Sequence, residues 1–382
     1  MDKYVYRSLC RSLGSLCRSV IDAIFRVPRR LYLRVNTTIV SRDQLLDLLR
    51  SKGIDVHPDP YIDEAIYILL AGPYRIEVLD KKIIVNRHAA ESIMMGANTY
   101  APGVIDYDYF KQGETITIMA PNMRPVAIGV AAVDSDALKK MKHGLVARTI
   151  KSVYRAPPIR DLPEYRAGYF YPQSLPAMMV ARLLDPKPGE VIVDMNSSPG
   201  GKTSHIVQLT RGAARVLAFD RNTGKVERVK ETLVRLRLYR NVVLTPADTR
   251  YIDIDLLGEN IADAVLIDPP CTGLGVRPKI EIRTSRADLI NSYQYQRQFF
   301  KPAKAIVKPG GRIIYSTCTL TYEENQGNIL YAIRTHKFQC VDLGNIPYAE
   351  KLVFDNCTAY RFGPHIEDMP GFFIAVLKKP LS

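Results

Sequence analysis

IDPPCTGLG at residues 267–275 and IIYSTCTL at 313–320 are the stretches that decide the fold of this chain. In each of them an apolar run, typical of a buried parallel strand, leads into a cysteine. Cys271 and Cys318 are therefore expected at the carboxyl ends of two strands, the edge of an open α/β sheet where ligands bind. Two prolines before Cys271 force the chain to turn over that edge, because proline interrupts both sheet and helix.

Free cysteines are usually small buried hydrophobic residues, but the position of these two after strand ends favours a chemical role. The six cysteines of the chain are irregularly spaced and include no CxxC pair. This spacing supports neither a disulfide scaffold nor a zinc site, so we expect a reducing compartment and no bound metal. Cys10 and Cys17, in a basic amphipathic segment at the N-terminus, are expected to face a core.

A glycine-rich turn upstream has the form of a cofactor-binding strand-to-helix turn. VIVDM at 191–195 predicts a buried strand, and NSSPGGKTSHIVQL at 196–209 follows it. The glycines let backbone amides approach an anion at the start of a helix, although the spacing of a phosphate-binding loop is not met. Later strands end at Asp220, Asp248 and Asp268, as in a doubly wound sheet. We expect Asp220 near ribose hydroxyls and Asp248 near the adenine edge.

Length and charge limit the class of protein. A chain of 382 residues is too long for one typical core and indicates two or three domains. The net charge of +14 and a pI near 9.4 add nothing to fold stability and indicate a polyanionic partner. Nucleic acid is the first candidate and an acidic membrane surface the second. No apolar run approaches the roughly 20 residues needed to span a bilayer, so no membrane segment is expected.

The first half of the chain predicts two smaller units. RLYLRVNTTIV at 30–40 is typical of a strand, and Ser41 caps a helix over 42–53 that ends at Gly53. Beyond it, short strands dominate. The patterns predict a hairpin over residues 76–86 and a helix over 88–96. They also predict two strands around a turn over 112–133 and one further strand over 144–154. Such a succession favours a small closed barrel.

The barrel region resembles a PUA domain, a compact RNA-binding barrel. The resemblance is carried by MGANTYAPGV at 95–104, KQGETITI at 111–118 and PVAIGVA at 125–131. Their glycines suit left-handed turns and close backbone approach. The resemblance implies an RNA partner, in agreement with the positive charge of the chain.

Residues 171–379 resemble the RNA 5-methylcytosine methyltransferases of the Sun-domain family, which use S-adenosylmethionine. The resemblance is carried by YPQSLPAMMVARLLDPKPGEVIVDMNSSPGGKTSH, AFDRN, PADTR, LIDPPCTGLG, YSTCTL and RFGPHIEDMPGFFIAVLKK. RLYLRVNT at 30–37 is similar to the N-terminal RNA-binding subdomain of that family. One departure is Asn196-Ser197-Ser198, where the family commonly has Cys-Ala-Ala.

The resemblance implies an α/β fold with a Rossmann-like class I methyltransferase domain, whose mostly parallel doubly wound sheet ends in an antiparallel hairpin turning at Gly371. A PUA β-barrel and an α+β N-terminal subdomain complete it. The expected N-terminal RNA-binding subdomain covers residues 1–75, and the PUA domain covers 76–155. A bridging segment packed on the catalytic domain covers 156–189, and the methyltransferase domain covers 190–382.

The resemblance also assigns roles to residues. Carbon 5 of cytosine is a poor nucleophile until a thiolate adds to carbon 6, and Cys318 matches the family's nucleophile. Cys271 matches the base that removes the carbon-5 proton and releases the enzyme. Asp268 would hydrogen-bond the cytosine, and Lys202 would orient Asp268 or lower a thiol pKa. Expected cofactor contacts are Asn196, Ser197, Ser198, Pro199, Gly200, Gly201, Lys202, Asp220, Arg221, Lys225, Asp248, Asp268 and Pro269.

Family members with a PUA unit in this place act on tRNA, which implies a monomeric, cytoplasmic tRNA (cytosine-5-)-methyltransferase. By resemblance the PUA unit reads the CCA end and presents an acceptor-stem cytosine, which frays easily and so is cheaper to extrude. Three alternatives stay open at this point: a ribosomal RNA methyltransferase, a DNA cytosine methyltransferase with Cys271 as nucleophile, and a non-catalytic RNA-binding protein. The Thr-Cys-Thr context of Cys318 disfavours the DNA methyltransferase. The presence of Cys271, Cys318, Asp268 and Lys202 together disfavours the non-catalytic protein.

Overall fold

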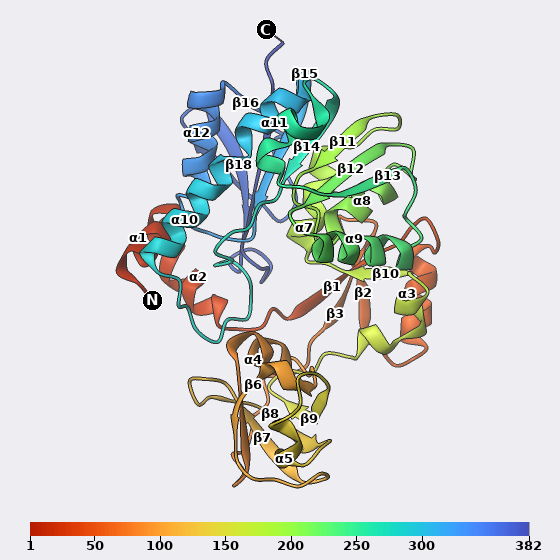
Figure 1. The fold of residues 1–382 in the computed structure, drawn as a ribbon, viewed down its shortest axis with the longest axis vertical. Coiled ribbons are helices and arrows are strands. Elements are labelled where there is room, and N and C mark those ends of the chain that lie inside the picture. The colour runs from red at the N-terminus through yellow and green to blue at the C-terminus, as the bar shows by residue number, and fades with distance from the viewer. Residues whose placement is uncertain (382) are drawn as a thin grey trace.

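The C-terminal half of the chain folds around one large sheet, seen in the upper part of Figure 1. The structure is a computed structural model that describes residues 1–381. Within this range the sheet has nine strands, ordered β13-β12-β11-β14-β15-β19-β18-β17 with β16 beside β19. Their bounds are β11 Val191–Asp194, β12 Arg215–Asp220, β13 Val242–Pro246, β14 Ala262–Ile267, β15 Val307–Thr317, β16 Gln339–Cys340, β17 Glu350–Phe354, β18 Cys357–Phe362 and β19 Phe372–Lys378.

Strands β11 to β15 are parallel, and β19 runs antiparallel to β15. The chain winds outward from β11 in both directions, so a crevice opens where β11 and β14 diverge at their carboxyl ends. This topology confirms the predicted doubly wound sheet with an antiparallel end.

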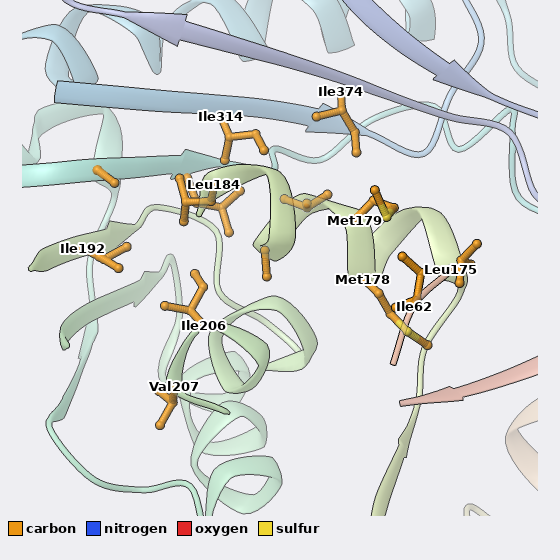
Figure 2. Close-up of a cluster of buried hydrophobic side chains, with 14 of the residues drawn as sticks. Ile62, Leu175, Met178, Met179, Leu184, Ile192, Ile206, Val207, Ile314 and Ile374 are labelled. Atoms are coloured by element: carbon orange, nitrogen blue, oxygen red, sulfur yellow. The ribbon is translucent and has the colours of Figure 1, made fainter. Parts of the chain in front are cut away.

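Helices cover both faces of this sheet. Their bounds are α7 Leu175–Leu184, α8 Gly201–Leu209, α9 Thr223–Arg235, α10 Arg286–Arg297, α11 Phe300–Ile306 and α12 Gln326–His336. Figure 2 shows Met179 and Leu184 of α7 on the side of Ile314 and Ile374, with Ile206 of α8 nearby. Each of these fully buried aliphatic side chains contributes about 1.5–3 kcal/mol to folding. On the other face Phe299 and the helices α11 and α12 form a second buried cluster.

Helix α7 begins and ends at residues that suit those positions. Pro176 lies in the first turn, where its missing N–H is not needed, and Asp185 ends the helix in a left-handed conformation with φ of 52°.

The N-terminal subdomain is a four-stranded sheet in the order β10-β1-β3-β2, with helix α3 and the short helix α6 packed on it. Its elements are β1 Arg30–Val35, α3 Arg42–Arg50, β2 Val56–Pro58, β3 Ala65–Leu69, α6 Pro163–Arg166 and β10 Phe170–Pro172. Ser41 forms a capping box with Gln44, as the sequence predicts for the start of α3. Strand β10 comes from the expected bridging segment and pairs with β1, so that segment completes this sheet before α7 packs on the catalytic one.

Two side chains, Arg34 in β1 and Asn36 directly after it, join this subdomain to the catalytic domain. Arg34, 1% exposed, donates from Nη1 to Gly201 O at 2.6 Å and from Nη2 to Ser204 Oγ at 2.6 Å. Asn36 donates to Leu236 O at 2.7 Å. Residues 34–36 therefore hold the two domains together, and Arg34 fixes the backbone of Gly201, the residue next to Lys202.

The PUA region is a six-stranded sheet in the order β5-β9-β8-β7-β4-β6, in the lower part of Figure 1. Its elements are β4 Lys82–Val85, α4 Arg87–Ile93, β5 Thr99–Tyr100, β6 Val104–Tyr107, β7 Thr115–Met119, β8 Pro125–Ala131, α5 Ser135–Leu138 and β9 Leu145–Ser152. The predicted hairpin at 76–86 is wrong. Only its second half is a strand, because β4 pairs with β6 and β7, later in the chain.

Two helices begin the chain, α1 Lys3–Leu13 and α2 Cys17–Ile24. Asp2 caps α1 by accepting from Tyr4 N at 2.7 Å. Buried side chains of this helix pair pack against Leu274, Leu289 and Leu320, beside the two cysteine stretches. The amphipathic prediction is thus confirmed, and the helix pair supports the loops that carry Cys271 and Cys318. In the described residues 1–381, no helix has the length and apolar character to cross a membrane.

The prediction that the cysteines outside the site remain uncrosslinked is wrong. Among residues 1–381, two disulfides join Cys10 to Cys17 and Cys340 to Cys357, with Cα atoms 4.8 Å and 5.2 Å apart. The first links α1 to α2, and the second links β16 to β18, which lie one after the other along the same edge of β19. Sequence spacing did not indicate either pair, because each pairing depends on how the strands and helices pack.

Loss of the Cys340–Cys357 disulfide is expected to lower the melting temperature by roughly 6–12 °C. The pair closes 17 residues, and restricting that loop in the unfolded chain stabilises the fold by about 3 kcal/mol. Calorimetry of the wild type and of a Cys340→Ala/Cys357→Ala variant measures the change, and a phosphine reductant should then lower the melting temperature of the variant less than that of the wild type, through Cys10–Cys17 alone. Thiol titration in denaturant should find the two free cysteines before reduction and all six after it; six at the outset would contradict the cross-links.

Candidate active site

The two free thiols lie together at the carboxyl edge of the sheet. Strands β14 and β15 are parallel neighbours with Ile267 opposite Tyr315, so the segments that follow them leave the sheet side by side. Cys271 Sγ and Cys318 Sγ are 3.3 Å apart, and both residues are partly exposed. The structure thus brings together two cysteines 47 positions apart in the sequence.

Close backbone packing brings the loop after Cys271 against the start of β19. Gly371 N donates to Gly275 O at 2.8 Å, and Gly275 N donates to Cys318 O at 2.9 Å. A Cβ atom on Gly371 would lie 2.6 Å from Leu320 Cδ1, so no larger residue fits. The expectation that Gly371 makes a hairpin turn is therefore wrong: its small size allows this approach.

Asp268 lies beside the thiols and is held by two donors. Lys202 Nζ is 2.5 Å from Asp268 Oδ2, and Ser316 Oγ donates to Asp268 Oδ1 at 2.9 Å. Burial opposes the charge on Lys202, but the neighbouring Asp268 carboxylate outweighs it and raises the Lys202 pKa. Lys202 is therefore a charged partner that orients Asp268. Ser316 was not singled out from the sequence, although it lies two residues before Cys318.

The surroundings make the two thiols unequal. The hydrogen bond from the Cys271 thiol lowers the pKa of Cys318, and the Lys202 ammonium acts in the same direction. The same sulfur contact, burial and the Glu324 carboxylate raise the pKa of Cys271 well above its ordinary value. Cys318 is thus the better thiolate, and Cys271 the better proton carrier.

A cavity of about 650 Å³ opens next to the thiols, between the ends of β11, β12, β13 and β14. Cys271 and Cys318 form one end of it. Of the expected cofactor contacts, the residues that line it are Asn196, Ser198, Asp220, Arg221, Lys225, Asp248, Asp268 and Pro269. Ser197, Pro199, Gly200, Gly201 and Lys202 are not among the residues that line it: the first three lie in the turn after β11, and the last two begin α8.

The turn after β11 has features that suit a polar ligand. Gly200 has φ of +100°, which permits the sharp entry into α8. Within residues 1–381, Asn196 Oδ1 and Ser197 Oγ are buried without a hydrogen-bond partner. Asp220 accepts from Ser198 N at 3.2 Å and lies 3.0 Å from Lys225 Nζ. Asn196 and Ser197 thus have polar atoms free to bind a ligand, and the Asp220 carboxylate can accept hydrogen bonds from ribose hydroxyls. These features fit S-adenosylmethionine, which combines an amino acid with a nucleoside.

The cavity also has walls that the sequence did not indicate. Asn222 and Thr249 line it just beyond two of the predicted acids, and Tyr295 and Phe299 add an aromatic side. Tyr295 comes from α10 and Phe299 from the residue before α11. Asp248 is also bound by Arg250, whose Nε lies 2.8 Å from its Oδ1.

A second cavity, of about 570 Å³, reaches Cys271 from the side of the PUA unit. Arg87 and His88 of α4 line one wall, and Arg283 and Thr272 line the catalytic side. The cofactor-side cavity and this PUA-side cavity thus meet at Cys271.

Comparison with known proteins decides the family. The model of the 16S rRNA methyltransferase RsmB/F family matches residues 181–378, a PUA domain model matches 81–153, and the ferredoxin-like domain of RsmF/B-like methyltransferases matches 5–77. The chain belongs to the RsmB/F family of cytosine-5 methyltransferases. The prediction of an S-adenosylmethionine-dependent RNA methyltransferase with a PUA domain is confirmed.

Relatives of this RsmB/F protein match along most of its length. A tRNA (cytosine(72)-C(5))-methyltransferase from Pyrococcus horikoshii is 36% identical over 91% of this chain and 89% of its own length. The human tRNA (cytosine(72)-C(5))-methyltransferase NSUN6 is 29% identical over 81% of this chain and 73% of its own. The crystal structure of NSun6 from Pyrococcus horikoshii with SFG, an S-adenosylmethionine analogue, covers 100% of this chain and 98% of that chain, with a TM-score of 0.89 at 33% identity.

Replacing Lys202 by methionine is expected to slow methyl transfer in a single turnover by about 100-fold. The substitution keeps the length of the side chain but leaves the Asp268 carboxylate without its charged partner at 2.5 Å. Rapid-quench assays with saturating cofactor measure the rate. Lys225→Met is the matched control: its ammonium contacts Asp220 in the cofactor-side cavity, so it should raise the KM for the cofactor and leave that rate nearly unchanged. Equal behaviour of the two variants would contradict the role given to Lys202.

Proposed function

We propose that this protein methylates carbon 5 of cytosine 72 in the acceptor stem of tRNA, with S-adenosylmethionine as donor. The single observation that carries the chemistry is the pair of sulfur atoms 3.3 Å apart at the junction of two cavities. One cavity suits the cofactor, and the other opens toward the PUA unit. The relatives named for tRNA cytosine 72, which match nearly the whole chain, support this target.

In the proposed mechanism the Cys318 thiolate adds to carbon 6 of cytosine. A carbon–sulfur bond forms, and the electron pair of the 5,6 double bond is released toward carbon 5 and nitrogen 3. Asp268, held by Lys202 and Ser316, shares a proton with nitrogen 3 of the cytosine in this proposal and so relieves the charge that develops there in the adduct. S-adenosylmethionine, when bound, supplies the electrophilic methyl group that carbon 5 takes up.

Cys271 completes the cycle in this proposal. After its own thiol proton has passed to solvent, the Cys271 thiolate accepts the proton from carbon 5, the 5,6 double bond re-forms, and the Cys318 sulfur leaves as thiolate. Its position beside Cys318 and the raised pKa of its thiol support a proton carrier rather than a nucleophile.

The PUA-side cavity supports RNA as the molecule that reaches the thiols from that direction. Arg87 provides positive charge on its PUA side, whereas Arg283 on the catalytic side is paired with Glu281 at 2.6 Å; the whole chain carries +14. We assign residues 1–75 and 76–155 to tRNA binding, 156–189 to the bridge and 190–382 to chemistry, in a monomeric cytoplasmic enzyme. The two disulfides are compatible with the cytoplasm of hyperthermophiles, whose intracellular proteins are rich in them.

The target is tested with three RNA substrates: a tRNA transcript with the CCA end, the same transcript without it, and a ribosomal RNA fragment. Bisulfite sequencing maps each methylated cytosine, and rates are measured at equal salt. We expect methylation at cytosine 72, slowed by about tenfold or more when CCA is removed, because each lost base contact costs on the order of 1–3 kcal/mol. Equal rates with and without CCA, or preferred methylation of the ribosomal fragment, would overturn the tRNA assignment.

A further inference from the structure

Glu324 is a buried carboxylate whose charge raises the pKa of Cys271 but which takes no part in the bond-making steps described above. It lies between β15 and α12 and is 0% exposed. Its oxygens accept from Thr272 N at 2.9 Å, Thr272 Oγ1 at 2.5 Å and Thr321 Oγ1 at 2.7 Å. Gln296 Nε2 is a fourth donor, at 2.9 Å. A carboxylate is acceptor-only, so all four donors are satisfied by one side chain.

Gln296 extends this arrangement to the residue on the other side of Cys271. Its Nε2 also donates to Pro270 O at 3.0 Å, while its Oε1 accepts from Tyr315 OH at 3.1 Å and Asn328 Nδ2 at 2.8 Å. Gln296 is 0% exposed, like Glu324. Together the two side chains hold the carbonyl before Cys271 and the amide after it, and both are fixed in turn by the core.

The same network reaches Cys318. Thr272 Oγ1 and Thr319 Oγ1 are 2.9 Å apart, which ties the residue after Cys271 to the residue after Cys318. Neither Glu324 nor Gln296 is among the described residues that line the cofactor-side or the PUA-side cavity. Any effect on a substrate therefore passes through the segments that carry Cys271 and Cys318, and three of the contacts, to Thr272 N, Thr272 Oγ1 and Pro270 O, lie on the Cys271 loop.

We infer that Glu324, together with Gln296, is a positioning residue that holds Cys271 at the distance from Cys318 needed for the release step. This inference rests on the roles proposed above for the two cysteines. A loose Cys271 loop leaves Cys318 free to attack and the methyl group free to transfer, but misplaces the base that takes the carbon-5 proton. The carboxylate thus acts late in the cycle, on release of the methylated RNA.

The test compares Glu324→Ala and Glu324→Gln with the wild type and Cys271→Ala, using tRNA and S-adenosylmethionine. Single-turnover methyl transfer is measured beside the covalent RNA adduct retained on denaturing gels. Glu324→Ala should transfer methyl at close to the wild-type rate, lose about 100-fold in steady turnover and accumulate methylated adduct, since a misplacement near 1 Å has costs of this size. Glu324→Gln keeps an acceptor for Thr272 N and should restore much of the turnover.

Two further variants keep the test decisive. Gln296→Met removes the donors to Pro270 O and Glu324 at similar volume, and should accumulate adduct even where Glu324→Ala does not fold. Glu64→Gln alters another buried carboxylate, bound to His205 at 2.9 Å and Arg182 at 2.6 Å, and should give no adduct.

The outcomes separate this inference from the proposed function. If Cys271→Ala accumulates adduct and the Glu324 and Gln296 variants do not, the positioning role is overturned. The same holds if Glu324→Ala loses the first methyl transfer, as that would place its action on Cys318. If Cys271→Ala itself gives no adduct, the roles proposed for the two cysteines are wrong, and the positioning role that rests on them is wrong with them.

Discussion

Cys318→Ala is expected to abolish methylation, with a loss of at least about 10⁴-fold in single turnover and no covalent RNA adduct. The nucleophile supplies the carbon–sulfur bond that makes carbon 5 reactive, and no neighbouring group can replace it in the same position. Among the described residues the other free thiol, Cys271, lies on the loop after β14 and has a raised pKa, which leaves it a poor substitute. Radiolabelled methyl transfer and denaturing gels measure the two quantities.

The control for this substitution is Cys340→Ala, which removes a cysteine that lines neither cavity. It should bind tRNA and cofactor and turn over at a rate close to that of the wild type at moderate temperature. Cys318→Ala should also bind both, because its side chain contributes little to either affinity. Retention of an adduct by Cys318→Ala would show that another residue attacks carbon 6.

Cys271→Ala is expected to trap the enzyme on its product. The Cys318 thiolate still attacks and the methyl group still transfers, but the base that removes the carbon-5 proton is gone, so the adduct persists. Steady turnover should fall by about 10²–10⁴-fold, the usual contribution of a general base, while a methylated protein–RNA band accumulates to nearly one per enzyme. The gel shift and the label in the same band establish both properties.

The opposite pattern defines the alternative. If Cys271→Ala loses the adduct and Cys318→Ala keeps it, attack comes from the cysteine after Asp-Pro-Pro, as in a DNA cytosine methyltransferase. Cys271→Ser provides a matched variant of similar size. It should release product slowly rather than not at all, because a hydroxyl can relay a proton but is a weaker base than a thiolate.

Much of the site could be predicted because its residues follow directly from strand ends. Asp220, Asp248, Asp268 and Cys318 each come within two residues of the end of a strand, so locating the strands located the residues. The parallel register of β14 and β15 then brings Cys318 beside the loop that carries Cys271. In an open α/β sheet, ligands bind at the carboxyl ends of the strands, so a pattern that locates the strand ends also locates the candidate site residues.

Other features depended on partners far along the chain. The segment 76–86 alternates like a hairpin, yet β4 pairs with β6 and β7, because the alternation indicates a strand but not its neighbour. Gly371 was expected at a turn, whereas its role is to let Gly275 approach. The disulfides link residues that are 7 and 17 positions apart, at spacings that no motif marks.

The sequence by itself determined the class of fold, the order of the strands along the chain, the placement of two free thiols after strand ends and the acids at the strand ends. These follow from hydrophobic period and turn chemistry, which act over a few residues. Only the tertiary structure decided that Arg34 braces the turn beside Lys202, that Glu324 and Gln296 hold the Cys271 loop, and that two cavities meet at one sulfur. Buried polar groups must find partners wherever packing brings them, and that requirement leaves no local pattern in the sequence.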